Sequence, residues 1–271
     1  NFTNMSYHER AVEILKYFID DYTEDEIKEC VYNAYTLEKF GCEEIAPVYK
    51  LTDNIHVLEL WHGPTSAFKD MALQILPHFL VKAMRKTGET DEIVILVATS
   101  GDTGKASLEG FRDVDGTKII VFFPNNGVSE VQKRQMITQE GSNVYSIAVE
   151  GNFDDAQNGV KAIFTNKELI DSMKKKGYKF SSANSINWGR LVPQIIYYFS
   201  AYCDIVKSGE INLGDKINIV VPTGNFGNIL AAYYAMIMGL PVNRLICASN
   251  ENNVLTDFIK SGIYNRNREF K

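Results

Sequence analysis

Residues 93–104 read IVILVATSGDTG, an apolar run that passes into a loop of small and polar residues. The run is rich in Val and Ile, and a segment with helical periodicity follows the loop. A short and continuous apolar run is typical of a strand that is buried on both faces of a sheet. This stretch therefore predicts a buried strand that leads through a loop into a helix.

The same order of strand, loop and helix recurs along the chain. Further apolar runs lie at Lys118–Phe123, Asn143–Val149 and Ile217–Val221, and each precedes a loop with Gly or Asn and then a segment of helical period. Strands that alternate with helices are joined by right-handed crossovers and form parallel sheets. We expect an α/β fold with mainly parallel sheets.

The first part of the chain has a different pattern, over about 45 residues. Ser6 with Glu9, and Thr23 with Glu26, match the capping box that starts a helix. Between these two boxes, apolar residues recur at helical spacing: Ala11, Val12, Leu15, Phe18 and Ile19. The pattern predicts a helical N-terminal cap.

The composition narrows the class of protein. The chain has 271 residues, 45% hydrophobic and 23% charged, and a formal net charge of -6. This length favours two packed lobes. The charges form no basic stripe and no apolar run approaches the ~20 residues of a membrane helix, so we expect neither nucleic acid nor a membrane as partner. Separated cysteines and scattered histidines predict free thiols in a reducing cytoplasm and no metal site.

A first candidate site is the loop HGPTSAFKD at 62–70, which follows the apolar run Ile55–Leu60 and precedes an amphipathic helix. Lys69 lies there between Phe68 and an apolar helix face, and partial burial favours a neutral amine. Condensation with an aldehyde requires a neutral amine. The plain alternative is a lysine in the first turn of a surface helix.

A second candidate site is the loop TSGDTG at 99–104. Its two glycines allow the backbone to approach a ligand closely, and Ser100 and Thr103 offer hydroxyl groups. The helix that follows offers free N–H groups for an anion. The plain alternative is a structural turn in which Asp102 caps the helix.

A third candidate site is the loop PTGNFGN at 222–228, again between a strand and a helix. A glycine-bearing loop that opens a helix can hold a phosphate through backbone N–H groups and the helix dipole. The loop lacks the glycine spacing of a dinucleotide site and the Lys-Ser/Thr ending of a Walker loop. It therefore indicates a phosphate-bearing cofactor other than NAD or ATP. A plain turn is a weaker explanation, because two Gly and two Asn lie so close together.

The three loops together offer an amine nucleophile, a polar loop beside an aromatic ring and a seat for a phosphate. Pyridoxal phosphate needs an anchor for its aldehyde, control of its ring oxygen and a seat for its phosphate. We expect pyridoxal 5'-phosphate as the cofactor.

The first two loops, with NSINWGR at 184–190 and GNFGN at 224–228, resemble threonine synthases, which belong to the tryptophan-synthase-β-like, or fold type II, pyridoxal enzymes. The motifs stand in the family's order, and the resemblance covers nearly the whole chain. It implies two interleaved lobes with the cofactor between them, at the C-terminal ends of strands. We expect a helical segment at 1–50, a larger cofactor-binding lobe at 51–88 and 166–271, and a smaller lobe at 89–165.

The resemblance also implies roles for individual residues. Lys69 would carry the cofactor and move protons on the substrate, and Asp102 would lie beside the 3-oxygen of the ring. An Asp there must share a proton with the ring oxygen, because two adjacent anions repel each other. The expected cofactor contacts are Lys69, Phe68, Asp102, Gly224, Asn225, Phe226, Gly227 and Asn228. The residue that faces the ring nitrogen would lie beyond Lys271.

Threonine synthases convert O-phospho-L-homoserine and water to L-threonine and phosphate, by γ-elimination followed by β-addition. The phosphate of such a substrate needs donors of its own, and a guanidinium group binds phosphate with two hydrogen bonds. The expected substrate-binding residues are Ser100, Thr103, Asn184, Ser185, Asn187 and Arg190. The sequence leaves open whether the protein is a monomer or a homodimer.

Two other functions remain open from the sequence. One is another pyridoxal enzyme of this fold, such as a serine or threonine dehydratase or a β-replacement enzyme. Asp102 and the run 184–190 argue against it, because they suit a phosphorylated substrate. The other is a threonine-synthase-like protein that binds phosphate ligands without turnover. Arg190 also has a plain alternative, a surface arginine on a helix.

Overall fold

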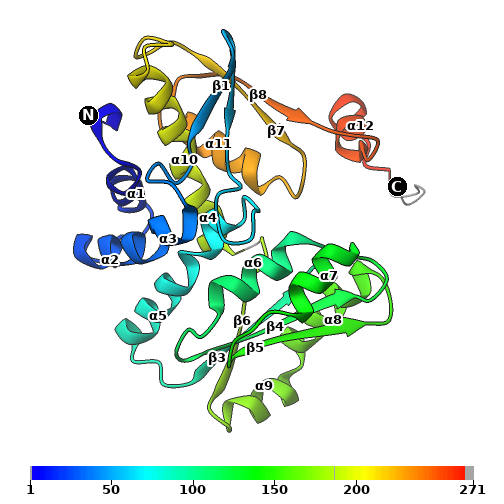
Figure 1. Cartoon of the computed structure of the whole chain (residues 1–271). Coiled ribbons are helices and arrows are strands. Elements are labelled where there is room, and N and C mark those ends of the chain that lie inside the picture. Colours follow the sequence, from blue (N-terminus) through cyan, green and yellow to red (C-terminus); the bar gives the residue numbers. More distant parts are fainter. Residues whose placement is uncertain (1, 186, 266–271) are drawn as a thin grey trace.

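Two α/β lobes make up the computed structural model, which describes residues 2–185 and 187–265 (Figure 1). Each lobe contains a parallel sheet, so the fold class expected from the sequence is confirmed. Within the described residues, no helix combines the length and the apolar character that crossing a membrane requires.

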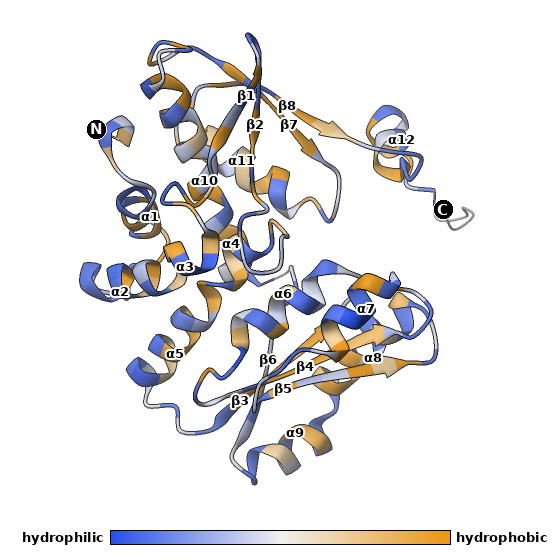
Figure 2. Cartoon of the chain, in the orientation of Figure 1, coloured by the Kyte–Doolittle hydropathy of each residue, from blue (hydrophilic) through white to orange (hydrophobic). Residues whose placement is uncertain are grey.

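A four-stranded parallel sheet forms the smaller lobe, in the order β5-β4-β3-β6. Helices α6 and α7 pack on one face of this sheet, α8 packs on the other, and α9 lies against β6. Figure 2 shows hydrophobic residues along these strands. The elements are β3 (Glu92–Ala98), α6 (Asp102–Phe111), β4 (Thr117–Pro124), α7 (Glu130–Ile137), β5 (Val144–Val149), α8 (Phe153–Thr165), α9 (Lys167–Lys174) and β6 (Tyr178–Ser182).

The larger lobe is built around one long helix, α10, which packs against α1, α4 and α11. A parallel pair of strands and an antiparallel hairpin complete it. Its elements are η1 (Phe2–Asn4), α1 (Tyr7–Leu15), α2 (Glu24–Ala34), α3 (Leu37–Phe40), β1 (Val48–Thr52), β2 (Ile55–Leu58), α4 (Asp70–Leu73), α5 (Leu76–Thr87), α10 (Trp188–Lys207), β7 (Ile217–Pro222), α11 (Gly227–Ile237), β8 (Val242–Ala248) and α12 (Val254–Ser261).

The sequence patterns predicted these elements well where the signal was strong. The four apolar runs at 93–98, 118–123, 143–149 and 217–221 coincide with strands β3, β4, β5 and β7 to within about a residue. Both capping boxes, at Ser6 and at Thr23, form as expected.

The boundary between the lobes differs from the one expected. Residues 166–182 were assigned to the larger lobe, but α9 lies against β6, and β6 pairs with β3 in the smaller lobe. Strand β6 reads YKFSS, so it lacks the continuous apolar run that marked the other strands. Its lysine and two serines interrupt the apolar pattern, which explains its weak signal.

The helix expected after Lys69 is interrupted. Helix α4 ends at Leu73, and α5 begins at Leu76 with Pro77 in its first turn. Proline has no N–H group, so it cannot donate the hydrogen bond that would continue the first helix into the second. The break leaves α4 as one short turn that carries Lys69 at its N-terminal end.

The N-terminal helices hold this short turn in place. The buried Tyr35, which directly follows α2, donates a hydrogen bond from its hydroxyl to the carbonyl of Met71 at 2.6 Å. The hydroxyl of Tyr22 donates to the carbonyl of Phe79 in α5 at 2.7 Å. The expected helical cap therefore contacts α4 and α5 through these hydrogen bonds. It also shares its hydrophobic core with α10.

Helix α6 lies very close to the sheet at Gly104. A Cβ atom there would lie 2.7 Å from Cγ2 of Thr99 and 3.1 Å from Cγ1 of Val121, and it would also meet the sulfur of Met136. Gly104 was expected to admit a ligand. Its contacts show that it serves helix-to-sheet packing instead.

We expect Gly104→Ala to lower the free energy of unfolding by about 1–3 kcal/mol, because a methyl group overpacks this contact. Gly159→Ala in α8 is the matched control. Nothing lies within 4 Å of its added Cβ, so it should raise stability by about 0.5–1 kcal/mol through helix propensity. Urea denaturation followed by circular dichroism measures both. Equal effects of the two substitutions would contradict the packing argument.

Candidate active site

The loop before Lys69 is fixed by a buried carboxylate. Asp70 is fully buried and accepts hydrogen bonds from the backbone N–H of Thr65 at 2.8 Å and from its hydroxyl at 2.7 Å. Gly63 lies against it, and a Cβ there would come within 2.5 Å of the Cβ of Asp70. Glycine and aspartate in this motif therefore shape the loop, and the shape places Lys69.

The Lys69 amine is mostly buried, beside an aromatic ring and a carboxylate. Its Nζ is 5.4 Å from the centre of the Phe68 ring and 3.5 Å from Oδ2 of Asp102, and 21% of its side chain is exposed. Burial lowers the pKa of Lys69, and the positive charge of Arg190 lowers it further, while Asp102 opposes the shift. The amine thus loses its proton more readily than a surface lysine, as a nucleophilic lysine must.

The second loop is organised by Thr99, which the sequence did not single out. Its hydroxyl oxygen accepts hydrogen bonds from the N–H groups of Gly101 and Gly104, both at 3.1 Å. Gly101, not Asp102, is the N-cap residue of α6, so the capping role considered for Asp102 is not found. The carboxylate of Asp102 is free to face Lys69 across the junction between the lobes.

The hydroxyls of Ser100 and Thr103 have no hydrogen-bond partner within the described residues. Ser100 is exposed, and Thr103 is partly exposed on the first turn of α6. Both hydroxyls therefore remain available to a ligand.

Arg190 is a buried cation without an anion. It is 4% exposed, and Nη1 donates to the carbonyl of Ala183 at 2.8 Å, whereas Nε is buried without a partner. It forms no ion pair with any residue in the described ranges. Burial lowers the pKa of Arg190 to about 10. The plain alternative of a surface arginine is wrong, and a buried unpaired guanidinium calls for an anionic ligand.

The side-chain amides of Asn184 and Asn187 form hydrogen bonds with backbone groups. Asn184 donates to the carbonyl of Ala98 at 2.9 Å, which ties the end of β3 to the segment after β6. Asn187 accepts from the N–H of Gly189 at 2.9 Å and donates to the carbonyl of Ser182 at 2.8 Å. These contacts occupy both side chains, so the structure gives them a supporting role. Ser185 is exposed between them, and Ile186 of the same motif lies outside the described residues.

The third loop presents backbone donors. Phe226 is in the left-handed region with φ of 62°, and it begins α11 without a side-chain cap. Four N–H groups have no acceptor among the described residues: those of Gly224, Asn225, Gly227 and Asn228. A Cβ added at Gly227 would meet only Nε2 of Gln194, at 3.9 Å, so the space in front of the loop is open. Free N–H groups at a helix start beside open space are a seat for a phosphate.

Helix α10 links this loop to Arg190. Gln194, one turn beyond Arg190, donates to the carbonyl of Arg190 at 2.6 Å and faces Gly227. One turn further, the hydroxyls of Tyr197 and Tyr198 both donate to Oδ1 of Asn228, the former at 2.6 Å. Asn228 thus contributes its N–H group to the loop, while its side chain anchors the loop to α10. Figure 1 places α4 and the starts of α6 and α11 at the junction of the lobes.

The residues fit pyridoxal phosphate. Lys69 offers an amine for the aldehyde, and the four N–H groups of the third loop offer a seat for the phosphate. Asp102 and the ring of Phe68 lie beside Lys69. In the described part of the chain, no cluster of three or more His, Cys, Asp or Glu side chains could hold a metal ion.

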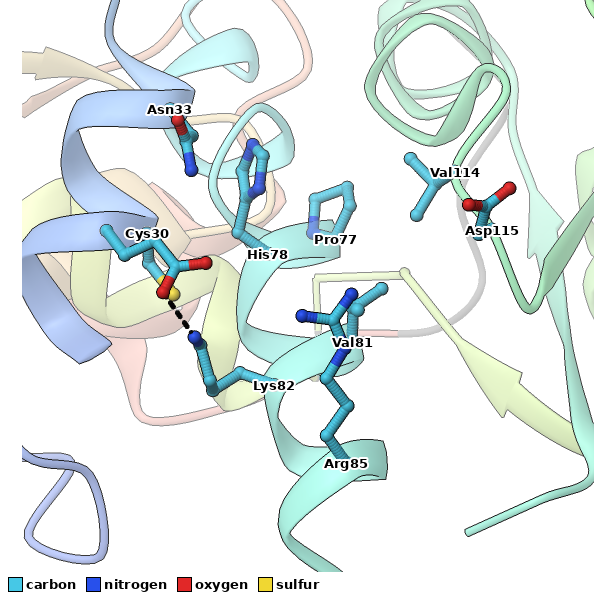
Figure 3. Close-up of a pocket in the computed structure, with 10 residues that line it drawn as sticks. Cys30, Asn33, Pro77, His78, Val81, Lys82, Arg85, Val114 and Asp115 are labelled. Carbon is cyan, nitrogen blue, oxygen red and sulfur yellow. Dashed lines mark hydrogen bonds and ion pairs between the residues drawn. The ribbon is translucent and has the colours of Figure 1, made fainter. Parts of the chain in front are cut away.

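A separate cavity of about 270 Å³ lies between α2 and α5 (Figure 3). His78, Lys82 and Arg85 line it, and Lys82 forms an ion pair with Glu29 at 2.6 Å. Burial lowers the pKa of His78 to about 4, so this imidazole is neutral at pH 7. None of the candidate site residues lines this cavity, so it does not belong to the candidate active site.

Comparison with known proteins gives a consistent result. A protein described as "Threonine synthase-like 1" from Homo sapiens is 46% identical over 267 residues, which cover 96% of this chain and 35% of that protein. Threonine synthase from Pseudomonas aeruginosa is 42% identical, over 98% of this chain and 54% of that protein. The chain thus spans about a third to a half of the length of these relatives.

Solved structures agree. The pyridoxal-phosphate-bound threonine synthase from Brucella melitensis superposes with a TM-score of 0.86 at 38% identity, covering 99% of this chain and 55% of that one. The yeast threonine synthase gives the same TM-score at 34% identity, over 100% of this chain and 53% of that one. The family model described as "Pyridoxal-phosphate dependent enzyme" matches residues 40–269. The chain therefore belongs to the pyridoxal-phosphate-dependent enzymes, with the fold of threonine synthases.

Proposed function

We propose that this chain binds pyridoxal phosphate on Lys69 and converts O-phospho-L-homoserine and water to L-threonine and phosphate. The observation that carries the proposal is Arg190, a buried cation without an anion that lowers the pKa of Lys69. A substrate with a phosphate group at this place would supply the missing anion. The relatives named threonine synthase support the same reaction.

The cofactor, when bound, supplies an electron sink for the carbanion of an amino-acid substrate. The N–H groups of Gly224, Asn225, Gly227 and Asn228 would bind its phosphate. Asp102 would face its ring oxygen. These contacts would hold the cofactor between the lobes.

Lys69 would move the protons. Its amine is partly buried and its pKa is lowered, so it can take a proton from the α-carbon of the substrate and return protons to neighbouring carbons. Arg190, Ser100 and Thr103 would bind the substrate phosphate, through one cation and two neutral hydroxyls. A single cation binds the group while still allowing the phosphate product to leave.

A second candidate function is the binding of a phosphate ligand without turnover. The 46% identity to a protein named "Threonine synthase-like 1" favours it, because that name separates the relative from the synthases themselves. A dehydratase or a β-replacement enzyme is less favoured, because its unphosphorylated substrate would leave Arg190 without an anion. We place the protein in the cytoplasm on the basis of its four free cysteines, with no nucleic-acid partner.

Reduction of the cofactor-loaded protein with borohydride should fix pyridoxyl phosphate on Lys69. Digestion and mass spectrometry locate the adduct. Lys105 is the internal control, because it is paired with Glu109 at 3.4 Å and should stay unmodified. An adduct at another lysine would refute the assignment of Lys69.

We expect Gly227→Val to weaken cofactor binding by about 10- to 100-fold, because the branched side chain would occupy the open space before the free N–H groups. Asn225→Ala keeps the backbone donors and should bind the cofactor like the parent protein. Fluorescence titration with pyridoxal phosphate measures both affinities. If Gly227→Val binds normally, the loop is only a turn.

Arg190→Met should lower kcat/KM for O-phospho-L-homoserine by roughly 30- to 1000-fold, because a charged hydrogen bond to the phosphate is lost. Slow deamination of serine should fall much less, since serine carries no phosphate. Arg190→Lys keeps the charge and should recover part of the activity. Equal losses on both substrates would make Arg190 a structural residue, and a faster deamination of threonine than its synthesis would favour the dehydratase.

A further inference from the structure

The start of helix α7 lies beside Asp102. Ser129 caps α7, and its hydroxyl accepts the N–H of Gln132 at 3.2 Å. The side-chain oxygen of Gln132 in turn accepts from the hydroxyl of Ser129 at 3.1 Å and from its N–H at 3.4 Å. This reciprocal capping box fixes which end of the Gln132 amide points toward the helix.

Because the oxygen of Gln132 is held by Ser129, its amide nitrogen points outward. Nε2 donates to Oδ1 of Asp102 at 2.7 Å. The other oxygen, Oδ2, is the one that lies 3.5 Å from Nζ of Lys69. One carboxylate oxygen of Asp102 therefore accepts a hydrogen bond from α7, and the other lies near the amine of Lys69.

Gln132 is the main restraint on this carboxylate. The side chain of Asp102 is 49% exposed, and Gln132 and Lys69 are the partners that it has within the described residues. A half-exposed carboxylate without such a partner would rotate and exchange its contacts with water. The parallel sheet explains why Asp102 and Gln132 lie side by side. Strands β3 and β4 end at the same edge of the sheet, and they lead to α6 and α7, which carry these two residues.

We propose that Gln132 is a positioning residue, which fixes the carboxylate of Asp102 so that one oxygen faces Lys69 and the ring oxygen of the cofactor. The part concerning the cofactor rests on the proposed function, whereas the part concerning Lys69 does not. A glutamate at this position would cap α7 equally well, but it would set a second anion against Asp102. Glutamine can cap the helix with its side-chain oxygen and, at the same time, donate a hydrogen bond to Asp102 with its nitrogen.

The first test uses the cofactor-free protein. Competitive acetylation with acetic anhydride, followed by mass spectrometry, gives the pH midpoint for deprotonation of Lys69, whose charged neighbours are Asp102, Asp70 and Arg190. Gln132→Glu should raise this midpoint by about 0.5–1 pH unit, because an added anion stabilises the charged amine. Ser129→Ala, which releases the oxygen of the Gln132 amide but adds no charge, should not raise it. No rise in Gln132→Glu, or an equal rise in Ser129→Ala, would overturn the contact.

The second test separates positioning from capping by a double-mutant cycle on cofactor affinity. Gln132→Met should weaken binding of pyridoxal phosphate by about 3- to 10-fold in the parent protein and by less than about twofold when Asp102 is already alanine. Equal losses in both backgrounds would show that Gln132 acts through the helix and not through Asp102. A parent protein that binds no pyridoxal phosphate would refute the proposed function, and the acetylation result would still decide the contact with Asp102.

Discussion

The cationic side chains of Lys69 and Arg190 lie at the junction of the lobes, and the half-exposed carboxylate of Asp102 forms an ion pair with Lys69. Burial and Arg190 lower the pKa of Lys69, and Asp102 opposes that shift. Arg190 itself has no carboxylate partner within residues 2–185 and 187–265, and an unpaired buried cation destabilises a fold. The rest of the protein must offset that cost. It does so with the apolar core around α10 and with the hydrogen bond from Tyr35 that holds α4.

Helix α10 connects Arg190 to the loop at 224–228. Its first turn carries Arg190, its second carries Gln194 beside Gly227, and its third anchors Asn228 through two tyrosine hydroxyls. The helix is buried along most of its length, so these spacings are set by helix geometry and packing. A loop that binds through backbone N–H groups needs such an anchor, and here the side chain of Asn228 provides it by accepting from both tyrosine hydroxyls.

The sequence predicted the parts of the fold that depend on long apolar signals. Strands β3, β4, β5 and β7 are rich in Val and Ile. Strand β6 carries a lysine and two serines, and it pairs with β3 in the smaller lobe, not in the larger lobe to which it was assigned. The break between α4 and α5 depends on a single proline, Pro77. At the candidate site, the sequence singled out Lys69 and Asp102, and the structure places their side chains 3.5 Å apart. Gln132 was missed because its S-x-x-Q spacing with Ser129 signals a helix cap, while the contact with Asp102 arises only when two strands align.

Most residues of the recognisable motifs support the site and do not carry its chemistry. In the first motif, Gly63, Thr65 and Asp70 shape the loop, and Lys69 alone offers a reactive group. In the run 184–190, the side chains of Asn184 and Asn187 form hydrogen bonds to backbone groups, and Arg190 is the charged residue. Such a framework keeps the amine of Lys69 and the N–H groups of the loop at 224–228 in place. The choice of reaction then depends on the few side chains that the framework leaves exposed to the ligand. Here these are Asp102, which Gln132 contacts, the hydroxyls of Ser100 and Thr103, and Arg190, which has no anionic partner within the described residues.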